Sequence, residues 1–122
     1  MSYPYSPFTG ALRKLSHVQE DIQRVRHQRP HLAEVADNLL GFIVRDLATL
    51  QDWMDQPRDS VPYYFASGVE WLDYISTQME ALNYLYLVLF NYRAGDDLVN
   101  DTIHTQLPEI REMLTQQEKP PG

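Results

Sequence analysis

Apolar residues recur at spacings of three and four along most of the chain, which predicts a protein built from α-helices. The strongest pattern lies between residues 61 and 93, where two such rows run side by side. A helix with two adjacent apolar rows is expected to be covered on most sides, so we predict that it is the centre of the fold. The first row is Phe65, Gly68, Leu72, Ile75, Met79, Leu82, Tyr86 and Leu89, and the second is Trp71, Tyr74, Gln78, Ala81, Leu85, Val88 and Tyr92.

The same spacing predicts three further helices, at about residues 9–28, 31–54 and 96–117. Proline interrupts helices, so Pro30 separates the first two. We expect a tight hairpin there, because the alternative, one long helix kinked at Pro30, would leave a long apolar row uncovered. Pro108 is expected to kink the last helix by freeing the carbonyl of His104.

Four helices with short connections favour an all-α, up-down antiparallel four-helix bundle. We expect a single domain over residues 1–122, with residues 1–7 as an extended arm and residues 118–122 as a frayed tail. Ser60 and Asp96 are the expected N-caps of the third and fourth helices, and Gly95 is the expected C-terminal cap of the third. Gly41 lies inside the second helix, where we expect a neighbouring helix to approach closely.

Composition narrows the class of protein. The chain has 122 residues, a formal net charge of -7 and no cysteine, which excludes disulfides and cysteine-based zinc sites. Its longest apolar run is far shorter than the about 20 residues that span a bilayer, and no N-terminal signal is visible. An acidic chain is poorly suited to neutralising phosphates. We therefore expect a cytoplasmic protein with no membrane partner, no cofactor and no nucleic-acid partner.

The basic residues concentrate in residues 24–31, which read RVRHQRPH. The predicted bundle places this segment beside the acidic start of the last helix, and we interpret the pairing as charge complementarity. A metal site is an alternative, because mixed nitrogen and oxygen donors suit zinc, iron or manganese. Its candidate ligands are His27, His31, Asp97, Asp101 and His104.

Arg26 and His31 are separated by four residues. This spacing resembles the Arg-x(4–6)-His pattern of the HEPN superfamily, helical proteins that often dimerise and cleave RNA. The resemblance implies that His31 acts as a general acid or base and that Arg26 stabilises negative charge at phosphorus. Pro30 directly before the histidine, and His27 where the family often has an amide, depart from that pattern.

The second apolar row of the third helix suggests a different function. An outer helix of a bundle needs one apolar face, so a second implies another cover: the N-terminal arm, a second copy or a different protein. Aromatic residues are typical of interface cores, and two-fold dimers are the commonest assembly. We predict a homodimeric, non-enzymatic interaction module, such as an adaptor, chaperone or regulatory subunit in a bacterial or phage setting. The predicted interface is Trp71, Tyr74, Tyr84, Leu85, Leu87, Val88 and Tyr92.

Overall fold

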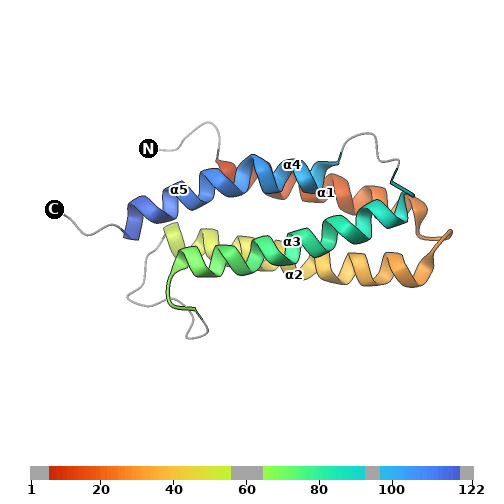
Figure 1. Cartoon of the computed structure of the whole chain (residues 1–122), viewed down its shortest axis with the longest axis horizontal. Coiled ribbons are helices and arrows are strands. Elements are labelled where there is room, and N and C mark those ends of the chain that lie inside the picture. Colours follow the sequence, from red (N-terminus) through yellow and green to blue (C-terminus); the bar gives the residue numbers. More distant parts are fainter. Residues whose placement is uncertain (1–5, 56–64, 93–96, 119–122) are drawn as a thin grey trace.

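The computed structural model describes residues 6–55, 65–92 and 97–118, and within these ranges it contains helices and no strand (Figure 1). In this bundle α2 packs against α1 and α3, while α4 and α5 together form a fourth helix that packs against both α1 and α3. The predicted four-helix bundle is confirmed. Its elements are α1 (Pro7–Val25), α2 (Pro30–Asp55), α3 (Gly68–Leu89), α4 (Leu98–His104) and α5 (Gln106–Glu118).

The first two helices form a hairpin and run antiparallel to each other (Figure 1). The turn between them is tied to the C-terminal end of α3 by Arg29. Its guanidinium donates to the carbonyl of Val88 at 3.3 Å and to Oδ1 of Asn91 at 2.9 Å. The expected hairpin at Pro30 is therefore present, and the single kinked helix is not.

The core contains the first apolar row of α3. All members of this row that lie within the helix, from Gly68 to Leu89, are buried. It also contains one apolar row from α1 and one from α2, although Val35 of α2 is 55% exposed. Removing such side chains from water is the main stabilising contribution to a bundle of this size. The largest fully buried side chains are Phe8, Leu15, Ile22, Ile43, Leu47, Leu50, Leu72, Ile75, Met79, Leu82, Ile110 and Leu114.

The structure corrects both ends of α3, predicted over residues 61–93. The helix begins at Gly68, because Ser67 Oγ accepts from the Glu70 N–H at 3.1 Å while Glu70 Oε2 accepts from the Ala66 N–H at 3.1 Å. Reciprocal bonds of this kind satisfy amides that a helix start leaves free. The helix ends at Leu89, where Asn91 and Tyr92 take left-handed φ values of 51° and 60°. The expected caps Ser60 and Gly95 lie outside the described residues.

Three smaller predictions also change. The first helix starts at Pro7 rather than near Thr9, since proline at the first helical position loses no hydrogen bond there. Asp97 caps α4, and its Oδ1 accepts from the Asn100 N–H at 3.0 Å; the expected cap, Asp96, lies outside the described residues. A Cβ added at Gly41 would meet nothing within 4 Å, so no neighbouring helix of this chain approaches it.

The kink in the last helix is present, but it lies at Thr105, between α4 and α5. Pro108 has no N–H to donate to the carbonyl of His104, and its ring crowds that carbonyl, so the break falls in the preceding turn. Lys14 of α1 bridges the break. Its ammonium forms an ion pair with Asp101 and a 2.8 Å hydrogen bond with Oε1 of the buried Gln106. None of the described helices is long and apolar enough to cross a membrane.

Candidate functional site

Trp71 belongs to the core and not to the predicted interface. Its side chain is only 4% exposed. Phe65 stacks on it with ring centroids 6.0 Å apart, and Trp53 of α2 lies against it at 6.3 Å. The chain therefore covers this ring itself. The spacing along the sequence placed Trp71 in the second apolar row. It could not show which residues from elsewhere in the chain would cover the Trp71 ring.

The other predicted interface residues lie at the surface or partly below it. Tyr74, Tyr84 and Tyr92 are exposed, the last two by 63% and 64%. Leu85, Leu87 and Val88 are partly buried. The charged residues of α3 are Glu70, Asp73 and Glu80, and residues 81–92 contain none. Residues 81–92 therefore expose Tyr84 and Tyr92 to solvent and carry no formal charge.

The exposed apolar surface continues onto α2, the neighbour of α3. Val35 and Phe42 lie seven residues apart on one stripe of α2, and Phe42 is 56% exposed. The sequence analysis missed this stripe, although the phase of Phe42, one residue before the buried Ile43, placed it beside the core row rather than in it. We define the α2/α3 face as the exposed residues Val35, Phe42, Tyr74, Ala81, Tyr84 and Tyr92.

A groove of about 570 Å³ lies between α2 and α3 at the Tyr74 end of this face. Phe42, Phe65, Trp71 and Tyr74 line it, and the rings of Phe65 and Tyr74 are 5.5 Å apart. Two charged side chains, Arg45 and Asp46, complete the lining with Gln78. The groove therefore combines aromatic walls with one acidic and one basic group.

The two charged groups of this groove are not paired. Burial raises the pKa of the Asp46 carboxyl above its ordinary value, and the nearby Arg45 offsets part of this effect. The Arg45 guanidinium lies 5.4 Å from the centroid of the Phe42 ring, a cation–π contact. Within the described ranges neither side chain forms an ion pair. Both therefore line the groove without a direct ion pair to any described residue, although Arg45 is close enough to act on Asp46.

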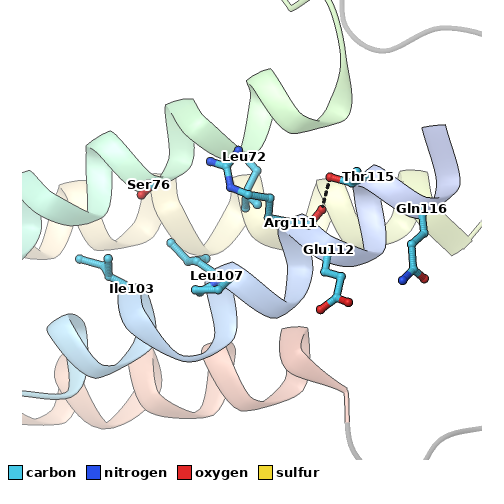
Figure 2. A pocket seen from close by; sticks show the side chains of 9 residues that line it. Leu72, Ser76, Ile103, Leu107, Arg111, Glu112, Thr115 and Gln116 are labelled. Atoms are coloured by element: carbon cyan, nitrogen blue, oxygen red, sulfur yellow. Dashed lines mark hydrogen bonds between the residues drawn. The ribbon is translucent and has the colours of Figure 1, made fainter. Parts of the chain in front are cut away.

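A second groove, of about 480 Å³, lies between α3 and the α4–α5 helix, with Leu72, Ile103 and Leu107 among its lining (Figure 2). Arg111 reaches from α5 toward α3 beside Leu72 and forms an ion pair with Asp73. The Thr115 hydroxyl donates to the Arg111 carbonyl at 2.8 Å. The cation of this groove thus has its partner within the chain. The other residues that line it are Ser76, Pro108, Glu112, Thr115 and Gln116.

The candidate metal ligands do not come together. Across the part of the chain that the structure describes, no three histidine or acidic side chains are grouped so that they could hold an ion. Asp101 pairs with Lys14, and Asp97 caps α4. The Asn83 amide, turned to donate, lies 2.7 Å from Asp97, which shows that α4 begins beside α3 and short of its end. The remaining candidates are the exposed His27, His31 and His104.

The two residues of the HEPN-like pattern lie on either side of the α1–α2 turn. Arg26 is the C-cap of α1, and its Nη1 donates to Oε1 of Gln23 at 3.3 Å. His31 is in the first turn of α2, and both side chains are exposed. Neither lines the two grooves described above.

Comparison of the chain with protein-family models, with curated proteins and with solved structures finds no match.

Proposed function

We propose that the protein is a non-enzymatic interaction module that binds a second copy of itself through the α2/α3 face. The observation that carries this proposal is the uncharged surface of residues 81–92. On it, Tyr84 is 63% exposed and Tyr92 is 64% exposed. The exposed side of a bundle helix is normally charged or polar. Depletion of charge together with exposed tyrosine is typical of interface cores.

The size of the face is compatible with a dimer. Four exposed aromatic side chains, each of about 200 Å² and roughly half exposed, offer about 400 Å² per copy. A stable interface buries about 800 Å² per partner. The aromatic rings thus supply about half of the necessary area, and their smaller neighbours on the face contribute to the remainder. The four rings are Phe42, Tyr74, Tyr84 and Tyr92.

The setting that we propose is cytoplasmic, with the dimer serving as a small adaptor, chaperone or regulatory subunit. Two features support a role in binding over one in catalysis. The exposed apolar residues concentrate on two adjacent helices, while the histidines are dispersed along the chain. The basic side chain of the second groove, Arg111, is already paired with Asp73.

The test is light scattering on a sizing column over a wide range of protein concentrations. We expect a mass near twice the 14.3 kDa of one chain. Tyr84→Glu places a charge in the proposed interface and should raise the dissociation constant about tenfold or more, since burying an unpaired charge costs several kcal/mol. Met113→Glu is the matched control, because Met113 is an exposed apolar residue on α5.

A dimer that is weakened by Tyr84→Glu and unaffected by Met113→Glu supports the proposal. A monomer at every concentration contradicts self-association. A dimer that both variants weaken equally, or that neither weakens, contradicts the assignment of the interface to the α2/α3 face.

A further inference from the structure

Two neighbouring residues of opposite charge lie at the Tyr74 end of the α2/α3 face. Asp46 is partly buried in the aromatic groove, and Arg45 is exposed at its edge beside Phe42. In the described part of the chain, neither side chain has an ion-pair partner. Two other partly buried charged groups do have one: Lys14 pairs with Asp101, and Asp21 with Arg24. Asp37, also on α2, has a buried Oδ1 without a hydrogen-bond partner in the described ranges, but it does not line this groove.

The chemistry of the groove favours a guanidinium as its occupant. Removing a carboxylate from water is costly unless a cation or hydrogen-bond donors replace the water. Among the described residues Arg45 is near Asp46, but none forms an ion pair with it. Phe65 and Tyr74 present aromatic rings around the same hollow, and arginine stacks on aromatic rings more readily than lysine. A planar cation can therefore satisfy both the carboxylate and the rings.

We propose that Arg45 of a second copy enters this groove and pairs with Asp46. This inference rests on the proposed function, since it names the polar contact at the centre of the same dimer. Two-fold symmetry makes the contact reciprocal: if Arg45 of one copy reaches Asp46 of the other, the reverse contact forms as well. A single face that carries both charges side by side is complementary to itself.

The surface next to Arg45 leaves room for a second helix. Gly41 and Ala48 lie one turn before and one turn after Arg45, and both are exposed. A Cβ at Gly41 would have no neighbour within 4 Å, so a second backbone can approach there.

The test exchanges the two charges. Arg45→Asp gives each copy two acidic residues at the centre of the interface, and Asp46→Arg gives each copy two basic ones. We expect either variant alone to raise the dissociation constant about a hundredfold, because the two-fold axis repeats the repulsion. The double variant Arg45→Asp/Asp46→Arg restores opposite charges and should dimerise within about threefold of the wild type.

Mixing the two single variants gives the sharpest measurement. In the mixed dimer every acidic residue of one copy faces a basic residue of the other, so the two proteins should associate with each other although neither associates with itself. Charges that acted only within their own chain would give no such rescue. Circular dichroism melts check that each variant is folded. If Asp46→Arg fails to fold, Asp46→Asn replaces it and should weaken the dimer about tenfold.

The outcomes separate this inference from the proposal on which it rests. If Tyr84→Glu dissociates the dimer while Arg45→Asp changes its dissociation constant less than threefold, the face is correct and the Arg45–Asp46 contact is wrong. If the single variants dissociate the dimer but the mixture does not rescue it, the reciprocal contact is also wrong. If the wild-type protein is a monomer, the proposed function itself fails.

Discussion

Two sides, or flanks, of the bundle differ in how their charged and polar side chains are paired. Where α1 meets α3 and the α4–α5 helix, polar side chains near the core find partners in the same chain: Lys14 binds Asp101 and Gln106, and the Tyr86 hydroxyl donates to Asp21 at 3.0 Å. On the α2/α3 face aromatic rings are exposed, and Arg45 and Asp46 are unpaired in the described ranges. The first flank is complete within one chain. The second has the composition of a surface that is completed by another molecule.

The largest expected effect contrasts two positions of α3 that are two residues apart. Leu82 is fully buried, and Leu82→Ala should lower the free energy of unfolding by about 2–5 kcal/mol, because it removes buried methyl groups and leaves a cavity. Tyr84→Ala should change it by less than about 0.5 kcal/mol, since the ring is exposed. Urea unfolding, at concentrations where light scattering shows only monomer, measures both. A loss at Tyr84 comparable to that at Leu82 would show that the face is not open.

The sequence predicted the core of α3 better than its surface, for a physical reason. Helical spacing determines which residues share a stripe, so the buried row that ends at Leu89 could be read directly. It does not determine what reaches a second stripe from elsewhere in the chain. Trp71 and Tyr74 belong to the same predicted row, yet Trp53 and Phe65 cover the first while the second remains exposed.

The errors at helix ends have local causes, and some were avoidable. The segment from Ser67 to Glu70 has the spacing of a capping box and marks the observed start of α3, but Ser60 with Pro62 resembled a start as well. The metal hypothesis assumed that α4 begins at the end of α3. Instead, α4 begins beside Asn83. This position places Asp101 next to Lys14 and away from the histidines of the α1–α2 turn. The length of chain between two helices does not reveal such a shift.

A smaller effect tests the closed flank. Tyr86→Phe keeps the buried ring and removes only the hydroxyl that donates to Asp21. A hydrogen bond to a charged acceptor contributes about 1–3 kcal/mol, and Asp21 keeps its ion pair with Arg24, so we expect a loss near the lower end of that range. Tyr74→Phe is the matched control on the open flank and should be nearly neutral in monomer unfolding. Equal effects of the two substitutions would contradict the distinction between the flanks.

The smallest effect concerns Asp46, and its sign should depend on whether the protein is a monomer or a dimer. In the monomer, burial raises the pKa of Asp46 above the ordinary carboxyl value of 3.8. The folded chain then binds this proton more readily than the unfolded chain, so the contribution of Asp46 to stability declines as pH rises through these pKa values. At neutral pH the ionised carboxylate therefore opposes folding. Asp46→Asn should therefore stabilise the monomer at pH 7. The gain should be smaller than the loss caused by Tyr86→Phe, because the carboxylate is only partly buried. Below the pKa of Asp46 in the unfolded chain, the variant and the native chain should be equally stable.

In the dimer the guanidinium of the second copy would replace the lost water and lower the pKa of Asp46, which reverses the sign of the effect. Asp46→Asn should then reduce stability at pH 7, most clearly at concentrations well above the dissociation constant. Thermal unfolding in the Tyr84→Glu background reports the monomer, and unfolding of the otherwise native chain at high concentration reports the dimer. A stabilising effect of Asp46→Asn in both states would mean that Asp46 stays unpaired after association. Opposite signs would show that the same carboxylate opposes the fold of one chain and supports the assembly of two.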